Sequence, residues 1–323
     1  MTARAYRAEG EERVQDVDVA IIGGGPAGLA AGLYAARARR RSVLWEGALL
    51  GGQIAATGTI ENYPGLPDGI EGPALVAAMH GQAERFGLET HYEAITALQR
   101  EPPYYVLDTA AGRYRAKAVI VTAGATPNKL DVPGEAELTG KGVSYCATCD
   151  AAFFKGDEVA VIGGGDTALD EGLFAARFAR RVHIIHRRSA LRASALLQER
   201  ARAQPKIDFT WNTIVTRVNG RDAVTSLSLQ NVESAVASEL AVSGVFVFIG
   251  QTPNSSLLDG LVPLDRGGHA YVNLWMETDR PGLFVAGDVR VAAARQLVSA
   301  AGDGATAAIR ADHYIAERFD RGR

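Results

Sequence analysis

The sequence of 323 residues is poor in cysteine, in net charge and in long uncharged runs, and each shortage argues against a class of protein. Two cysteines are too few for a secreted disulfide scaffold, so we expect a reducing, cytoplasmic location. A formal net charge of -3 offers no basic surface, so we expect no binding to nucleic acid. Residues 1–15 are polar and charged, which predicts an N-terminal tail rather than a secretory signal. The uncharged run 19–36 is interrupted by Gly23-Gly24-Gly25-Pro26, so we expect no membrane segment there.

Glycine is abundant instead, with 36 residues gathered in a few short runs. The first run separates a β-branched segment, 17–22, from an alanine-rich segment, 29–40, and a second apolar segment follows at 42–45. This order of strand, glycine turn, helix and strand predicts a βαβ unit in a parallel sheet.

The same order returns at 158–162, 163–165, 167–178 and 182–185. We therefore predict an α/β protein with two Rossmann-like dinucleotide-binding domains. Further apolar segments end on glycine near residues 124, 250 and 287, and a helix is expected over 296–318. The expected domains are a tail over 1–15, a first domain over 16–127 and 254–323, and a second domain over 128–253 inserted into it, with Pro127 and Pro253 at the connections.

The first glycine motif is Gly23-x-Gly25-x-x-Gly28, between a strand and a helix. Its glycines allow a tight turn, close approach of a pyrophosphate and close packing of helix on strand, while the helix N-terminus favours the anion. Glu46 ends the second strand 18 residues after Gly28, where an acid binds ribose hydroxyls. The motif predicts a dinucleotide without a 2′-phosphate, FAD or NAD; the alternative is an ordinary glycine turn.

The second motif, Gly163-x-Gly165-x-x-Ala168, has no acid at the equivalent position. The strand after it ends in His186-Arg187-Arg188, and Arg192 follows. The arginines match the charge of a 2′-phosphate, so we expect NADPH rather than NADH. The alternative is that they form a solvated basic surface.

The third motif is Cys146-Ala147-Thr148-Cys149-Asp150. Two cysteines at this spacing are typical of a disulfide that exchanges with thiols. A zinc site would need two further ligands, and two structural cysteines are the other alternative. Asp150 is a candidate general acid/base, or else a helix-capping residue. Together the motifs predict a path from a nicotinamide through a flavin to a disulfide.

From about residue 16 to the C-terminus, the sequence that contains these motifs resembles the low-molecular-weight, bacterial-type thioredoxin reductases. The motifs that carry the resemblance are Gly23-Gly24-Gly25-Pro26-Ala27-Gly28, Gly51-Gly52-Gln53, Glu61-Asn62-Tyr63-Pro64-Gly65, Ala123-Gly124-Ala125, Cys146-Ala147-Thr148-Cys149-Asp150, Gly163-Gly164-Gly165-Asp166-Thr167-Ala168, His186-Arg187-Arg188, Leu191-Arg192-Ala193, Pro253-Asn254, Ala286-Gly287-Asp288-Val289 and Arg295-Gln296. The resemblance implies a homodimeric flavoprotein that reduces thioredoxin.

The resemblance also assigns residues to two cofactors. Those implied for FAD are Gly23, Gly25, Pro26, Ala27, Gly28, Glu46, Gly51, Gly52, Gln53, Asn62, Ala123, Gly124, Gly287, Asp288, Arg295 and Gln296. Those implied for NADPH are Gly163, Gly165, Asp166, Thr167, Ala168, His186, Arg187, Arg188 and Arg192.

The resemblance implies that Cys149 meets the flavin, that Cys146 attacks the disulfide of thioredoxin, and that Asp150 supplies the proton. It further implies a rotation of one domain about the stretches near 127 and 253. Ala151, Gln251 and Ala292–Ala294 depart from the pattern of the family, and the alanines stand where an aromatic residue beside the flavin is common.

Rival functions remain open from the sequence. A flavin-dependent dithiol oxidase, or a reductase of another small disulfide, shares the fold and the cysteine pair, but the oxidase usually lacks the three arginines. A ferredoxin-linked reductase would need no cysteine pair, a peroxide-system flavoprotein would need an N-terminal thioredoxin-like region, and a redox sensor would bind dinucleotide without turnover.

Overall fold

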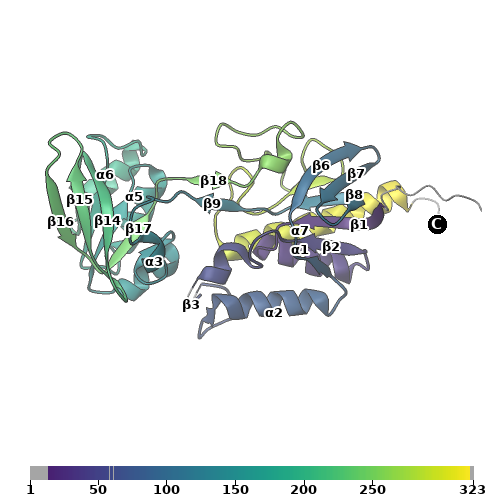
Figure 1. The fold of residues 1–323 in the computed structure, drawn as a ribbon, viewed down its shortest axis with the longest axis horizontal. Coiled ribbons are helices and arrows are strands. Elements are labelled where there is room, and N and C mark those ends of the chain that lie inside the picture. Colours follow the sequence, from purple (N-terminus) through teal and green to yellow (C-terminus); the bar gives the residue numbers. More distant parts are fainter. Residues whose placement is uncertain (1–13, 58, 61, 321–323) are drawn as a thin grey trace, which may run out of the picture. The chain divides into compact units, whose positions relative to one another are not determined.

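The computed structural model describes residues 14–57, 59–60 and 62–320 (Figure 1), and these residues form two compact units. The first unit contains Tyr63–Ala125, the described residues before Ile60, and the chain from Pro253 onward. The second contains Thr126–Thr252, together with Ile60 and Asn62. Most of the expected polar tail, residues 1–13, lies outside the described residues, and Gln15 already belongs to a strand.

A seven-stranded sheet forms the centre of the first unit, in the order β5-β2-β1-β8-β7-β6 with β19 beside β8. The parallel strands are β1 (Gln15–Ile22), β2 (Ser42–Trp45), β5 (Glu89–His91), β8 (Arg113–Val121) and β19 (Leu283–Val285). Strands β6 (Ile95–Glu101) and β7 (Tyr104–Thr109) pair antiparallel with each other, and β7 pairs antiparallel with the first half of β8.

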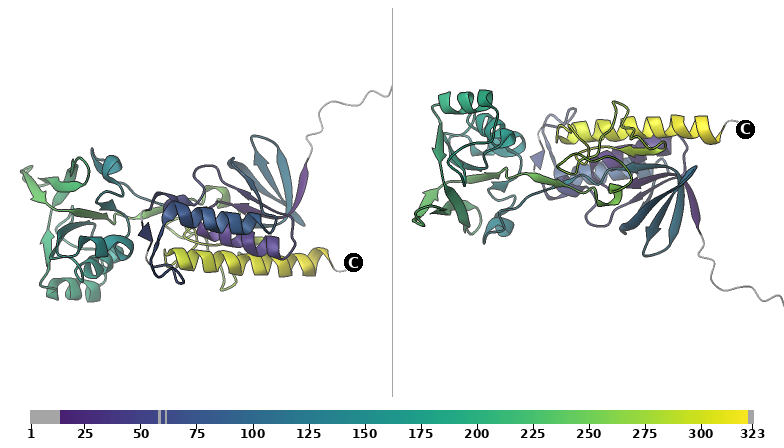
Figure 2. Two further views of the ribbon diagram at one scale, coloured as in Figure 1. Left: turned by 90° about the horizontal axis from the view of Figure 1, so that it is seen from below. Right: turned by 90° about the horizontal axis from the view of Figure 1, so that it is seen from above.

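Three helices pack side by side on one face of this sheet (Figure 2). They are α1 (Pro26–Arg37), α2 (Gly72–Glu84) and α7 (Leu297–Phe319). Helix α1 has small residues along its buried side, and a Cβ atom at Gly304 of α7 would lie 1.9 Å from the Ala27 carbonyl oxygen. This close approach of α7 to α1 therefore requires glycine, and it fixes the beginning of α7 beside the first glycine turn.

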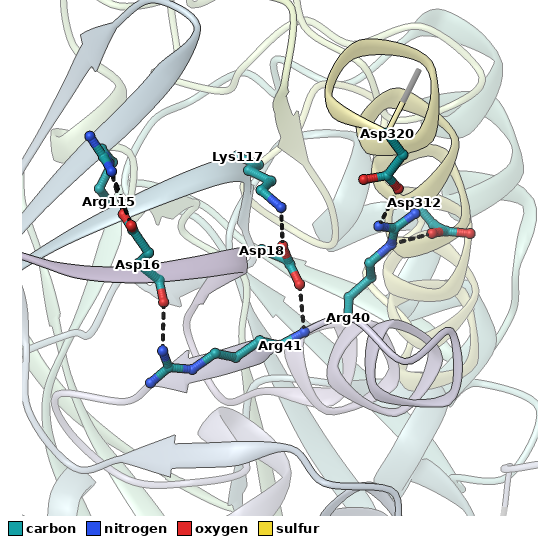
Figure 3. A network of polar contacts seen from close by, with 8 residues as sticks. All are labelled: Asp16, Asp18, Arg40, Arg41, Arg115, Lys117, Asp312 and Asp320. Carbon is teal, nitrogen blue, oxygen red and sulfur yellow. Dashed lines mark hydrogen bonds and ion pairs between the residues drawn. The ribbon is translucent and has the colours of Figure 1, made fainter. Parts of the chain in front are cut away.

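Ion pairs of Arg40, just after the end of α1, join this region to the C-terminal end of α7, and further pairs link β1 with β8 (Figure 3). The largely buried Arg40 donates to Asp312 at 2.6 Å and to Asp320 at 2.7 Å. In the adjoining strands, Asp18 accepts a hydrogen bond from Lys117 at 2.6 Å. Because Arg40 is only 15% exposed, its pairs are less screened by water than ordinary surface pairs, and they hold the last turns of α7 against α1.

The second unit has three layers. Its parallel sheet has the order β10-β17-β11-β12-β13, with helices on one face and a three-stranded antiparallel sheet on the other. The parallel strands are β10 (Val143–Ser144), β17 (Gly244–Val247), β11 (Glu158–Ile162), β12 (Arg181–Ile185) and β13 (Ile207–Thr210). The other elements are helices α3 (Glu135–Leu138), α4 (Ala147–Asp150), α5 (Asp166–Ala175) and α6 (Ala195–Ala203), and strands β14 (Thr213–Gly220), β15 (Val224–Asn231) and β16 (Ala237–Ala241).

The chain passes between the units through β9 (Ala125–Pro127) and β18 (Gln251–Pro253), which pair with each other. The remaining short elements are β3 (Thr59–Ile60), β4 (Ile70–Glu71), and the 3-10 turns η1 (Gly52–Ala56), η2 (Ala151–Phe154) and η3 (Ser256–Leu258). None of the helices in the described part of the chain combines the length and the apolar character that a membrane span requires.

The predicted fold class, with two βαβ units in parallel sheets, is confirmed. The predicted strands 42–45 and 158–162 coincide with β2 and β11, and the predicted helix 296–318 is α7 within one residue. The antiparallel strands β6–β7 and β14–β16 were not predicted.

Candidate functional site

In the first unit, most of the residues predicted to bind FAD follow the carboxyl ends of parallel strands. This edge of an open α/β sheet is where such folds bind ligands. After β1 come Gly23, Gly25, Pro26, Ala27 and Gly28; after β2, Glu46, Gly51, Gly52 and Gln53; after β8, Ala123 and Gly124; after β19, Gly287, Asp288, Arg295 and Gln296. Asn62 is the exception, because it is grouped with the second unit.

The glycines of the first turn have different surroundings. Gly23 has a φ of +105°, and a Cβ atom at Gly28 would lie 1.9 Å from the Gly23 carbonyl oxygen. Thr122 closes the turn from β8 by donating to that same carbonyl at 2.7 Å. A Cβ atom at Gly25 would meet nothing within 4 Å. The turn therefore leaves open space at the one glycine where a diphosphate is expected to approach.

Glu46 closes the other side of this turn. Its carboxyl oxygens accept hydrogen bonds from the backbone N–H groups of Gly24 and Ala48, each at 2.7 Å. A carboxylate has about four acceptor positions, so Glu46 keeps capacity for ribose hydroxyls while its orientation is fixed. The acid and the glycine turn thus form one rigid group that fits a dinucleotide without a 2′-phosphate.

A buried ion pair that the sequence analysis missed holds the turn after β19. Asp303 of α7 accepts two hydrogen bonds from Arg290, at 2.7 and 3.0 Å, and one from the Gly287 N–H at 3.1 Å. Asp303 is only 9% exposed. It thereby fixes Gly287 and its neighbour Asp288, and burial raises the pKa of Asp288, with Asp303 adding in the same direction.

The segment before α7 has an unusual backbone. Ala292 and Arg295 both have positive φ angles, +57° and +56°, which residues with side chains seldom adopt. The positive charge of Arg295 acts on Asp288 and opposes the rise in its pKa. Across the sheet edge, Gln53 donates to the Ala125 carbonyl at 2.7 Å.

In the second unit, the predicted NADPH residues follow β11 and β12. Gly163 has a φ of +150°, and a Cβ atom there would lie 2.4 Å from the Phe248 carbonyl oxygen. A Cβ atom at Gly165 would meet nothing within 4 Å, and Ala168 is completely buried. As in the first unit, the second glycine of the G-x-G motif, here Gly165, is the one that faces open space.

The segment after β12 crosses the beginning of α5. The Gly164 carbonyl accepts a hydrogen bond from the Arg192 N–H at 2.8 Å, and Asp166 accepts one from the Ser194 N–H at 2.6 Å. These bonds hold the backbone at Arg192 beside the glycine turn, and the side chains of Arg187, Arg188 and Arg192 in this segment are exposed. Exposed cationic groups in this segment have the charge that would suit a 2′-phosphate.

His186 is the buried member of this segment. A Cβ atom at Gly164 would lie 2.4 Å from its ring, and its Nε2 atom is buried without a hydrogen-bond partner. Burial lowers the pKa of His186, and the neighbouring arginines add to the effect. The ring thus brings a buried polar atom beside the glycine turn.

Cys146 and Cys149 form a disulfide, with their Cα atoms 5.3 Å apart. Cys146 caps α4, and its Sγ accepts a hydrogen bond from the Cys149 N–H at 3.2 Å. Both cysteines are partly exposed.

Asp150 ends α4 and lies largely away from water. Burial raises the pKa of its carboxyl group, and a hydrogen bond with Ser144 acts in the opposite direction. Ser144 also accepts the Cys146 N–H at 3.0 Å. A carboxyl group with a raised pKa beside a disulfide fits a proton donor.

A second buried acid supports the segment before the disulfide. Glu135 is only 2% exposed and accepts the N–H groups of Leu130 and Asp131 at 2.9 and 2.8 Å. It also accepts the Tyr145 hydroxyl at 3.0 Å. Burial, with Glu135 beside it, raises the pKa of Tyr145 to about 12. No sequence motif indicates Glu135.

Two glycine turns on parallel sheets, together with an exchangeable disulfide, define a dinucleotide-dependent disulfide oxidoreductase. The model of the pyridine nucleotide-disulphide oxidoreductase family matches residues 17–305, so the chain belongs to that family.

The chain is similar to thioredoxin reductases over nearly all of its length. The one from Peptoclostridium litorale is 47% identical over 308 residues, covering 94% of this chain and 98% of that protein. The one from Bacillus subtilis (strain 168) is 43% identical over 308 residues, covering 95% and 96%. The crystal structure of the Streptococcus pyogenes enzyme matches with a TM-score of 0.89 and 39% identity, covering 94% of this chain and 100% of that one. The resemblance stated from the sequence is confirmed.

Proposed function

We propose that the chain is a thioredoxin reductase, which uses electrons from NADPH and a bound FAD to reduce the disulfide of thioredoxin. The observation that carries the proposal is the Cys146–Cys149 disulfide, which lies in the same unit as a glycine turn flanked by arginines. The similarity to thioredoxin reductases supports the choice of substrate.

The first unit is proposed to bind FAD. Gly25 leaves room for the diphosphate, Glu46 accepts ribose hydroxyls, and the turn at Asp288 holds the ribitol. Bound FAD supplies two-electron chemistry between a nicotinamide and a disulfide. The second unit is proposed to bind NADPH through Gly165 and the arginine segment.

The cysteines are proposed to carry out thiol–disulfide exchange. When the pair is reduced, the Cys146 thiolate attacks one sulfur of thioredoxin's disulfide and releases the other as a thiolate. Cys149 then attacks Cys146, which releases reduced thioredoxin and restores the disulfide. Two electrons and two protons pass to thioredoxin, and Asp150, whose pKa is raised by burial, is proposed to supply a proton.

A homodimer, a cytoplasmic location and the two-domain assignment belong to the same proposal and are supported by the resemblance. Because both the disulfide and the nicotinamide must reach the flavin, the units are proposed to change their relative position during turnover, with β9 and β18 as the connections.

The test is NADPH oxidation by the FAD-loaded protein with oxidised thioredoxin, run beside a Cys149→Ser variant. We expect turnover that depends on thioredoxin and is lost in the variant. Turnover without thioredoxin, with oxygen consumed when a small dithiol is supplied and no dependence on NADPH, would instead identify a dithiol oxidase.

A further inference from the structure

The loop between the two cysteines is held by an acid that belongs to another helix. Glu171, in α5, accepts the Thr148 N–H at 2.8 Å through one carboxyl oxygen and the Thr148 hydroxyl at 2.9 Å through the other. Thr148 lies between the cysteines, 23 residues earlier in the chain. Both carboxyl oxygens of Glu171 are therefore engaged by Thr148.

These hydrogen bonds determine which backbone N–H groups near the disulfide can donate to a cysteine sulfur. The Cys149 N–H points at Cys146 Sγ, at 3.2 Å, whereas the N–H one residue earlier is occupied by Glu171. Backbone N–H groups at the start of a helical turn stabilise a thiolate once a cysteine pair is reduced. Glu171 therefore withholds one such donor and adds a negative charge close to the pair.

The redox loop also rests on α5 through apolar contacts. Ala147 and Ala151 are almost completely buried, in one cluster with Ala168 and Leu169 of α5. Helix α5 begins at the glycine turn proposed for NADPH. Glu171 thus fixes the loop to an element whose position is set by the sheet.

We propose that Glu171 is a positioning residue that keeps the Cys146–Cys149 pair strongly reducing. The reason is electrostatic: a cysteine pair whose thiolate is stabilised is more oxidising, and a nearby carboxylate that also occupies an N–H donor destabilises the thiolate. A strongly reducing pair passes electrons on to a protein disulfide. The inference rests on the proposed function, because it assigns this role to the redox pair.

The first experiment measures thiolate formation in the FAD-loaded protein. In a Cys149→Ser background Cys146 is the sole thiol, since the chain has two cysteines. Its alkylation by iodoacetamide is followed from pH 5 to pH 9 (roughly the range over which thiols titrate). Adding Glu171→Gln should shift the profile to lower pH and raise the rate at acidic pH by about threefold to tenfold.

The second experiment measures the thiol–disulfide equilibrium with both cysteines present. The protein is equilibrated in mixtures of reduced and oxidised dithiothreitol, trapped by acid and alkylation, and analysed by mass spectrometry. Glu171→Gln should move the equilibrium toward the dithiol by about threefold to tenfold.

Two variants serve as controls. Thr148→Val removes the hydroxyl bond but keeps the N–H bond and the charge, so its alkylation profile should remain near that of the parent. Glu199→Gln removes the same charge from an exposed position on α6 and should change neither measurement. Unchanged profiles in Glu171→Gln, or an equal shift in Glu199→Gln, would overturn the inference.

Different experimental results would show that the inference is wrong and that the proposed function is wrong. If NADPH does not reduce the disulfide of the unaltered protein, the proposed function is wrong. If NADPH reduces it and Glu171→Gln leaves the equilibrium unchanged, only the role of Glu171 is wrong.

Discussion

The two glycine turns share the same order of strand, turn and helix but differ in the residue at the third position of the motif. In the first unit, the third position must be glycine, because a Cβ atom at Gly28 would meet a backbone oxygen at 1.9 Å. In the second unit, the same position is Ala168, whose methyl group is fully buried. In both, the second glycine alone faces open space. The comparison shows that the third position serves packing, whereas no described residue packs against the second, which would leave room for a ligand.

The surroundings of the turns differ in charge as well. The acid Glu46 lies on the first turn, held by two backbone N–H groups, whereas exposed arginines follow the buried His186 beside the second. An acid suits free ribose hydroxyls and arginines suit a 2′-phosphate. The difference supports two different dinucleotides rather than two copies of one site.

The largest effect should come from adding a side chain at Gly28, the third glycine of the first motif, where the helix packs on the strand. Gly28→Ala inserts a methyl group into backbone, so we expect the flavin-free protein to lose about 1–3 kcal/mol of stability or more. Thermal unfolding of the flavin-free protein measures this loss. The matched variant, Ala168→Gly, removes a methyl group instead and should cost about 1–2 kcal/mol. Equal stability of Gly28→Ala and the parent would show that this position does not need glycine.

The next largest effect should come from removing the positive charges beside the second glycine turn. Arg187→Ala with Arg188→Ala should raise KM for NADPH by about tenfold to a hundredfold, because each loses a charge-assisted hydrogen bond. KM for NADH should change little, and Arg200→Ala, an exposed arginine on α6, is the control. An unaltered preference between the two nucleotides would mean that the arginines form only a solvated surface.

The second glycine of each turn separates ligand binding from packing. Gly25→Ala should weaken FAD binding by about tenfold and leave the unfolding temperature of the flavin-free protein unchanged, since the added Cβ meets nothing within 4 Å. Gly165→Ala should weaken NADPH in the same way while FAD is retained. Equilibrium binding of each nucleotide to both variants provides the measurement. Loss of the wrong nucleotide would reverse the assignment of the units.

The smallest effect concerns the buried Asp288 of the first unit. Its pKa is higher in the folded protein than in the unfolded chain, so folding favours its protonated form. The resulting destabilisation is absent below the unfolded pKa, grows as the pH rises from the unfolded pKa to the folded pKa, and is constant above it.

Asp288→Asn lacks this group. It should therefore make the flavin-free protein more stable at neutral pH, an advantage that shrinks as the pH falls toward the ordinary Asp pKa of about 3.9. The same variant should bind FAD more weakly. Unfolding temperatures of the two flavin-free proteins between pH 4 and pH 7 (roughly the span from the ordinary Asp pKa to neutrality) test it, and a difference that is constant with pH would contradict it.

Local sequence patterns predicted the turns and the disulfide because each depends on residues close together in the chain. Gly23 to Gly28 and Cys146 to Cys149 carry their spacing in the sequence. Glu171 and Asp303 have partners that only the fold brings near, 23 and 13–16 residues away, and a single acid within a helix has no distinguishing pattern.

The antiparallel strands escaped prediction for a related reason. Strands β6 and β7 meet at Pro102-Pro103, and β14 to β16 mix polar and apolar residues without a regular period, which fits either surface strands or loops. Their pairing is settled by packing: β15 contributes Leu227 and Leu229 to the cluster under the parallel sheet. The sequence periodicity alone did not separate these possibilities.

The most direct test of the electron path is an anaerobic titration of the FAD-loaded protein with NADPH, followed by flavin absorbance. A flavin and a disulfide in one circuit should together consume about two equivalents of NADPH per subunit, and the Cys146→Ser, Cys149→Ser double variant about one. Flavin that stays oxidised after NADPH is added, or equal consumption by the two proteins, would contradict the account.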